Sequence, residues 1–170
     1  GKIVAVGEIG LDYHYKHSPI AQQKAVFARF LQLAQELDLP AIIHVREASE
    51  DAIALLESEN NGKLKGVLHC FSGDPELAKA ALDMGLMISY TANCTFPKAT
   101  LVRDSIKFVP LENIMIETDC PFLAPQAFRG KRNEPSYVIK VAEQIAEVKG
   151  ISVEEVARKT TKNAKQFFRI

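Results

Sequence analysis

This sequence lacks several features that identify common functional classes. Lysine plus arginine and aspartate plus glutamate number 21 each, so the net charge is zero and the overall positive charge of many nucleic-acid-binding proteins is absent. No apolar run approaches the roughly 18 residues of a membrane span. The first residues carry no secretory signal peptide. We therefore expect a cytoplasmic protein without membrane contact, in which only a local basic patch binds a polyanion.

Cysteine is scarce, and its three positions, Cys70, Cys94 and Cys120, lack the paired spacing of a zinc finger. An odd number of cysteines without such spacing is typical of reduced thiols in a cytosolic protein. Cys70 and Cys94 are expected to serve packing rather than nucleophilic attack. A Ser-His-Asp motif and a phosphate-binding glycine loop are also missing.

Strand-like and helix-like segments alternate along all 170 residues. Strands are predicted at 3–9, 41–44, 66–69, 86–89 and 113–117, and helices at about 19–37, 49–58, 75–84, 98–108, 136–149 and 152–167. This alternation is typical of an α/β protein with a parallel sheet. The composition does not shift along the chain, so one domain is expected over residues 1–170.

Several predicted helices begin with recognisable capping residues. Ser18, followed by proline, is predicted to be the N-cap of the first helix. Asp74, also followed by proline, opens the third helix. Ser152 and Glu155 form a capping box for the last one.

Four potential metal ligands stand at or just beyond the C-terminal ends of four of the predicted strands: Glu8, His44, His69 and Asp119. The carboxyl ends of parallel strands converge on one face of an α/β protein, so these side chains are expected to meet. Carboxylate and imidazole groups together suit a divalent metal. Taken singly, each residue has an ordinary structural explanation, such as a buried histidine or a turn-capping aspartate. Their joint placement predicts a metallohydrolase site.

Five motifs surround these residues. They are residues 7–12 (GEIGLD), 40–46 (PAIIHVR), 69–73 (HCFSG), 117–121 (ETDCP) and 129–135 (RGKRNEP). In this order, over essentially the whole chain, they resemble the TatD-like metal-dependent deoxyribonucleases of the amidohydrolase superfamily. The resemblance implies a (β/α)8 TIM-barrel fold and metal-dependent, exonuclease-like hydrolysis of phosphodiester bonds in DNA, including single strands. It also implies a monomer at full length.

The resemblance further implies roles for the four residues. Glu8 would bridge two metal ions from barrel strand 4, and His44 and His69 would be ligands on strands 5 and 6. Asp119 would be the strand 8 ligand that also handles the proton of the attacking water, which makes Glu8 and Asp119 the catalytic residues. Two divalent ions are expected per complete site. The ligand types favour Zn²⁺ or Mn²⁺, and the resemblance keeps Mg²⁺ open.

One departure from the family pattern concerns the start of the chain. The family begins with a His-x-His motif on strand 1, and this sequence has none. The resemblance therefore implies that the chain holds only about strands 4–8 with their helices, the C-terminal two-thirds of the barrel. Such an open sheet has two unprotected edges and should be poorly stable alone. We expect a fragment of a longer enzyme.

Candidate substrate contacts are Arg46, Ser72, Arg129 and Arg132. The two later arginines, with Lys131, form the one dense basic cluster of the sequence. They suit phosphate positioning, although a solvated loop explains them as well. Arg46 could contact either a phosphate or a carboxylate of the site, and Ser72 could donate to a phosphate oxygen.

Other residues leave two interpretations open. Glu117 could orient a ligand or be a buried structural carboxylate. Tyr13, His14 and Tyr15 could stack on bases or pack on the surface. At the level of function, hydrolysis of another ester or a C–N bond is an alternative, as is an inactive fragment that acts as an interaction module.

Overall fold

The computed structural model describes residues 2–73 and 75–170, so the predicted cap Asp74 lies outside the described residues. The described chain contains one five-stranded parallel sheet in the order β1-β2-β3-β4-β5. The strands are β1 (Val6–Asp12), β2 (Ala41–Arg46), β3 (Gly66–Leu68), β4 (Met87–Tyr90) and β5 (Ile114–Ile116). The predicted parallel α/β sheet is confirmed, with strand ends shifted by up to three residues.

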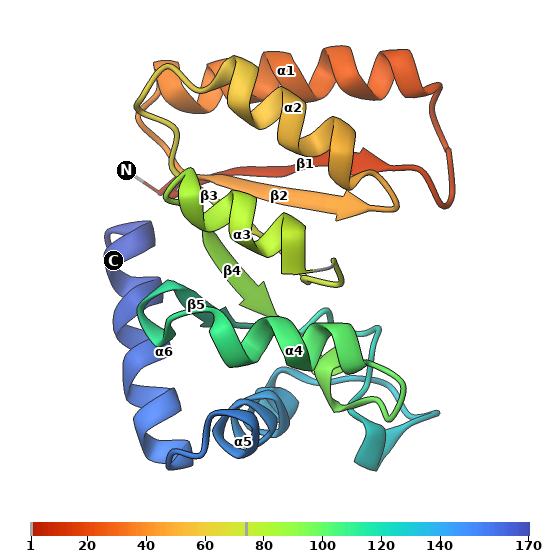
Figure 1. Cartoon of the computed structure of the whole chain (residues 1–170), viewed down its shortest axis with the longest axis vertical. Helices are drawn as coiled ribbons and strands as arrows, with labels where there is room; N and C mark the ends of the chain where they lie inside the picture. Colours follow the sequence, from red (N-terminus) through yellow and green to blue (C-terminus); the bar gives the residue numbers. More distant parts are fainter. Residues whose placement is uncertain (1, 74) are drawn as a thin grey trace.

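Helices connect successive strands on the outside of the sheet, and Figure 1 shows α1 to α4 following one another along it. The helices are α1 (Ile20–Glu36), α2 (Ser49–Glu59), α3 (Pro75–Asp83), α4 (Thr100–Phe108), α5 (Val138–Lys149) and α6 (Val153–Phe168). Four short 3-10 turns lie in the loops, at 92–95, 111–113, 126–128 and 135–137, and the sequence did not predict them. Among the described residues, no helix is long and apolar enough to cross a lipid bilayer.

The core lies between the sheet and its helices. Phe27 and Leu31 of α1, Leu56 of α2 and Ile106 of α4 are fully buried against strand residues such as Ile43. The sheet is open, since within the described residues β1 pairs only with β2 and β5 only with β4. The expectation of an open five-stranded sheet is therefore confirmed.

The predicted helix caps had two outcomes. Ser152 caps α6, because its hydroxyl accepts the backbone N–H of Glu155 at 3.1 Å. The prediction for Ser18 was wrong: α1 begins one residue later, with Pro19 at the cap position. The Ser18 hydroxyl instead contacts the Gln22 side chain, and Gln23 binds the Ser18 carbonyl and ties it to the end of β1.

Candidate metal centre

A local irregularity in β1 positions Glu8. The register between β1 and β2 shifts between Val6 and Ile9, because two residues of β1, Gly7 and Glu8, lie opposite the single residue Ile42 of β2. A bulge of this kind re-aims the side chains next to it. Gly10 then allows the strands to touch, because a Cβ there would lie 1.9 Å from the carbonyl oxygen of His44. The two glycines in residues 7–12 therefore belong to the backbone that presents Glu8.

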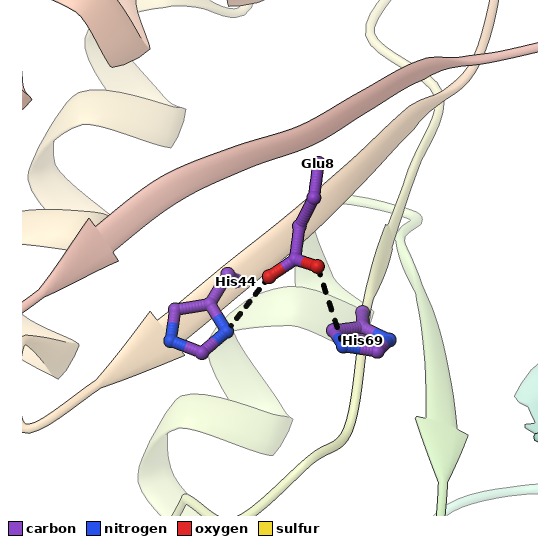
Figure 2. Close-up of side chains that lie close together, drawn as sticks. All are labelled: Glu8, His44 and His69. Atoms are coloured by element: carbon purple, nitrogen blue, oxygen red, sulfur yellow. Dashed lines mark ion pairs between the residues drawn. The ribbon is translucent and has the colours of Figure 1, made fainter. Parts of the chain in front are cut away.

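The carboxylate of Glu8 lies between two imidazoles, as Figure 2 shows. Its Oε1 atom is 3.0 Å from Nδ1 of His44, which lies two residues before the end of β2. Its Oε2 atom is 3.7 Å from Nε2 of His69, directly after β3. One ligand atom from each residue lies within 4.8 Å of the other two. Three of the four predicted metal ligands are thus brought together.

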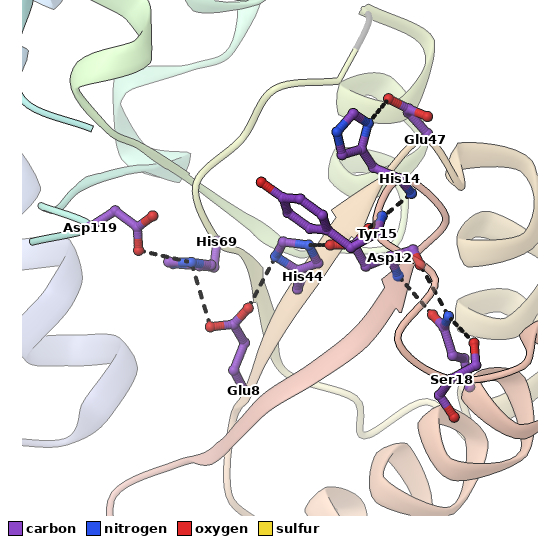
Figure 3. Close-up of polar contacts among 10 residues, drawn as sticks. Glu8, Asp12, His14, Tyr15, Ser18, His44, Glu47, His69 and Asp119 are labelled. Atoms are coloured by element: carbon purple, nitrogen blue, oxygen red, sulfur yellow. Dashed lines mark hydrogen bonds and ion pairs between the residues drawn. The ribbon is translucent and has the colours of Figure 1, made fainter. Parts of the chain in front are cut away.

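Asp119 lies at the margin of this cluster. Its Oδ1 atom is 3.9 Å from Nε2 of His69, and Figure 3 shows it on the opposite side of His69 from His44. No hydrogen-bond donor among residues 2–73 and 75–170 engages its carboxylate side chain. Asp119 therefore remains available to a ligand or a water molecule.

Each imidazole also faces an outer carboxylate. Nδ1 of His69 donates to Oε1 of Glu117 at 2.8 Å, which leaves Nε2 directed at Glu8 and Asp119. The same oxygen of Glu117 accepts the backbone N–H of Cys70 at 2.6 Å. This pattern, in which a carboxylate fixes the tautomer of a ligating histidine, is common in metal sites. Of the two interpretations left open for Glu117, the orienting one fits these contacts.

His44 has a similar arrangement that the sequence reading missed. Its Nε2 atom lies 3.5 Å from Oδ2 of Asp12 and is a buried atom without a hydrogen bond. The signal was present, since Glu8 and Asp12 are four residues apart on one strand, and side chains at even spacing share a face. The sequence prediction gives Asp12 no role at the site, although the residue belongs to the motif at residues 7–12.

The pKa shifts within the cluster reflect the pairing of its carboxylates with its imidazoles. The hydrogen bond with His44 is the main reason that the pKa of Glu8 is lowered, and the nearby imidazoles outweigh the opposing effect of burial. Burial alone would lower the pKa of His69, but the hydrogen bond with Glu117 and the charges of Glu117, Glu8 and Asp119 raise it.

The donor set fits a divalent metal ion. One carboxylate and two neutral imidazoles at mutual distances below 4.8 Å suit Zn²⁺ or Mn²⁺.

A cavity of about 430 Å³ opens over the cluster. It is lined by Glu8, His44, Val45, Arg46, His69, Cys70, Ser72, Asn93, Asp119 and Leu123. Of the predicted substrate contacts, the structure places Arg46 and Ser72 in this lining. Arg129 and Arg132 are not among the lining residues: both are exposed on the loop after β5, where the Arg129 guanidinium lies over the Phe96 ring.

Neither cysteine near the site is poised as a nucleophile. Burial raises the pKa of the Cys70 thiol to about 12, and Cys94 is fully buried with its pKa raised to about 12 for the same reason. Nucleophilic thiols need lowered pKa values. The expectation that these residues serve packing agrees with their surroundings.

Comparison with known proteins places the chain in a family. A family model described as TatD related DNase matches residues 1–169. The chain belongs to this family. It is 49% identical over 169 residues to the uncharacterized metal-dependent hydrolase YabD of Bacillus subtilis, a match that covers 99% of this chain and 66% of YabD. It is 44% identical over 168 residues to the uncharacterized metal-dependent hydrolase YcfH of Escherichia coli K12, covering 99% of this chain and 63% of YcfH.

A TatD-family relative with a named activity matches less closely. The 3'-5' ssDNA/RNA exonuclease TatD of Pantoea ananatis is 37% identical over 171 residues, covering 98% of this chain and 66% of that protein. The fold is that of a solved family structure, YjjV, a TatD homolog from Escherichia coli K12, with a TM-score of 0.92, 30% identity and coverage of 99% of this chain and 64% of YjjV. The chain thus spans about two-thirds of the length of the curated relatives it matches, 66% of YabD and 63% of YcfH.

Proposed function

We propose that this chain carries the active-site face of a metal-dependent hydrolase that cleaves phosphodiester bonds in DNA in an exonuclease-like manner. The observation that carries the proposal is the Glu8–His44–His69 cluster at the floor of a cavity that also holds Asp119 and Arg46. Family membership supports it, as does the likeness to the Pantoea relative that is named a 3'-5' ssDNA/RNA exonuclease.

Glu8, His44, His69 and Asp119 are the proposed metal ligands, and a complete site is proposed to hold two divalent ions, Zn²⁺, Mn²⁺ or Mg²⁺. A bound ion supplies Lewis acidity, which polarises a phosphoryl oxygen and makes water more acidic. Glu117 holds the Nδ1 proton of His69 and so keeps its Nε2 lone pair turned toward the cluster. Asp12 faces His44 in the same way.

Asp119 is the proposed proton acceptor for the attacking water, and Glu8 the second catalytic carboxylate. The Asp119 carboxylate lines the cavity and is 37% exposed, so it is both near His69 and reachable by water. Arg46 and Ser72 are proposed to hold phosphate oxygens inside the cavity. Arg129 and Arg132 are proposed to hold phosphates farther along the substrate strand, because neither residue lines the cavity.

We also propose that residues 1–170 form a single domain whose five strands are equivalent to strands 4–8 of a (β/α)8 barrel. Two features support this assignment. The sheet is open at both edges within the described residues, and Val26 and Phe30 of α1 lie exposed in the groove beside β1. A barrel has no open edge, so in it both features would be covered.

The test uses a 5′-labelled single-stranded oligodeoxynucleotide with Mn²⁺, and products are followed by gel electrophoresis. Asp119→Asn should lower kcat by about 10²- to 10⁴-fold, the usual contribution of a general base. EDTA should abolish turnover. Asp104→Asn, which removes a surface carboxylate paired with Lys107, is the matched control and should leave kcat unchanged.

Three outcomes would contradict the proposal. Near wild-type turnover by Asp119→Asn would remove its assigned role. Hydrolysis of an acyl ester or amide panel without any cleavage of phosphodiesters would favour the other ester or C–N chemistry, and absence of both activity and bound metal would favour an interaction module.

A further inference from the structure

An arginine and an aromatic ring form a pair at the mouth of the cavity. The guanidinium carbon of Arg46 lies 4.6 Å from the centroid of the Tyr15 ring. Tyr15 is 57% exposed, although it is a large aromatic residue. The ring of His17 lies nearly parallel to it, at 14° and 5.4 Å between centroids, so the exposed surface is an extended aromatic row.

The loop that carries Tyr15 is held in place by polar contacts. The backbone N–H of Tyr15 donates to Oδ1 of Asp12 at 2.9 Å. The neighbouring Tyr13 donates its N–H to the carbonyl of Arg46 at 3.0 Å and its hydroxyl to Asp51 at 2.7 Å. Tyr13 is therefore a packing residue, whereas Tyr15 stands on a fixed loop with its ring in solvent. A pre-positioned ring loses little conformational entropy when it binds.

The guanidinium of Arg46 lies over the Tyr15 ring, and its N–H donors have no acceptor among the described residues. Across residues 2–73 and 75–170, no carboxylate forms an ion pair with its guanidinium, and no hydrogen bond from that group is present. Its positive charge also acts on the nearby Asp12 carboxylate, although the two groups form no ion pair. Its side chain lines the same cavity as Glu8 and Asp119 and is the one arginine or lysine there. Five N–H donors beside an acidic cluster suit a phosphate.

Asp12 connects this pair to the metal centre. Its Oδ1 atom accepts the Tyr15 backbone, and its Oδ2 atom faces His44, as Figure 3 shows. One carboxylate thereby fixes the distance between the aromatic row and the cluster. A ligand that occupies both places must have an anionic group next to a flat ring.

We propose that Tyr15 and Arg46 form a subsite for one unpaired nucleotide of the substrate strand, with Arg46 on its phosphate and Tyr15 stacked on its base. This inference rests on the proposed function and makes its substrate more specific. A base in a duplex has both faces covered by its neighbours, so only a base in a single strand or at a frayed end can reach the ring. Stacking is tolerant of base identity, so the subsite selects for unpaired strands and not for a sequence.

The experiment measures binding of two 5′-fluorescein decamers by fluorescence anisotropy in EDTA, which prevents metal-dependent turnover. One decamer is oligothymidylate and the other has abasic tetrahydrofuran units on the same phosphate backbone. Tyr15→Ala should raise the Kd for oligothymidylate about 5- to 150-fold, equivalent to ~1–3 kcal/mol for one stacked base, and leave the abasic decamer unchanged. Tyr15→Phe should bind both as the wild type does. Arg46→Ala should weaken both decamers.

Two variants serve as matched controls. Phe108→Ala removes an exposed ring from α4, and Arg158→Ala removes an exposed arginine from α6, both on surfaces outside the cavity lining. Neither should change either Kd. Equal loss of both decamers in Tyr15→Ala, no loss in Tyr15→Ala, or no preference of the wild type for bases would each overturn the inference. If the oligonucleotide is nevertheless hydrolysed in the Asp119 assay, the proposed function stands without the subsite.

Discussion

Replacement of Glu117 tests whether an outer carboxylate sets the metal affinity of this centre. A single oxygen of Glu117 accepts from Nδ1 of His69 at 2.8 Å and from the backbone of Cys70 at 2.6 Å. Glu117→Gln can place its amide oxygen at the same point and keep both hydrogen bonds, so it removes only the charge. Glu117→Ala removes both contacts and releases the His69 ring.

The magnitudes follow from this difference. Loss of a partner that orients a ligating histidine typically costs about 10- to 100-fold in metal affinity, or ~1.4–2.7 kcal/mol, which we expect for Glu117→Ala. A hydrogen bond to a charged acceptor is worth about 1 kcal/mol more than a neutral one, so Glu117→Gln should cost about 5-fold. The ordering wild type, then Gln, then Ala is the central expectation.

Two measurements check it. Isothermal titration with Mn²⁺ gives the affinities, and NMR of the metal-free protein gives the titration of His69. The negative charges around His69 raise its pKa against the effect of burial, so both variants should lower it. A raised folded-state pKa stabilises the metal-free fold at acidic pH, and this contribution is lost as the pH rises through that pKa. The variants should therefore lose stability at acidic pH relative to the wild type.

Glu112→Gln is the matched control, because Glu112 pairs with Lys159 on the surface and faces no histidine. It should leave both the Mn²⁺ affinity and the His69 titration unchanged. If Glu117→Ala binds Mn²⁺ as tightly as the wild type, the orienting role is refuted. The structural interpretation of Glu117 would then hold.

Three other expectations concern reactivity, association and stability. Iodoacetamide near pH 8 should label exposed Cys120 and spare Cys94, because burial raises the pKa of the Cys94 thiol to about 12. Peptide mass mapping measures the labelling of each cysteine, and equal labelling would contradict the prediction. Val26 and Phe30 are 47% and 39% exposed beside an open strand edge. The average mass of the chain in light scattering should therefore rise with protein concentration, and replacement of both residues by lysine should reduce this self-association. Ser152→Ala should lower the Tm by about 2–4 °C in a thermal melt, since an N-cap is worth ~1 kcal/mol.

The sequence predicted the sheet well because its strands are short apolar runs between clear helical stripes. It failed where long-range contacts decide the outcome. Ser18 and Ser152 both precede a helix, yet only Ser152 caps one. The side chain of Gln23 donates to the carbonyl of Ser18, and α1 starts after Pro19. The four short 3-10 turns were missed because each is only three or four residues long and has no periodicity to detect.

The candidate ligands were predictable because parallel strands fix where their carboxyl ends lie. Glu8, His44 and His69 meet as expected, although Glu8 lies near the start of β1 and not at its carboxyl end, because the strand extends to Asp12. The outer carboxylates that face the two imidazoles were less predictable from the sequence. Asp12 and Glu117 gain their roles from which nitrogen of each imidazole they face, and a sequence does not specify the orientation of a ring.

The proposed ligands differ strongly in how far their side chains are buried, and this difference affects metal binding. The side chain of His69 is 14% exposed and is fixed by Glu117, whereas that of Glu8 is 50% exposed on the edge strand β1. Water therefore competes with a ligand at Glu8 much more than at His69, and electrostatic attraction is weaker in the wetter environment. The rigid half of the centre is the β3–β5 side, where His69, Glu117 and Asp119 lie. It follows that any element that covers the open edge of β1 should tighten metal binding by shielding Glu8, without adding a ligand.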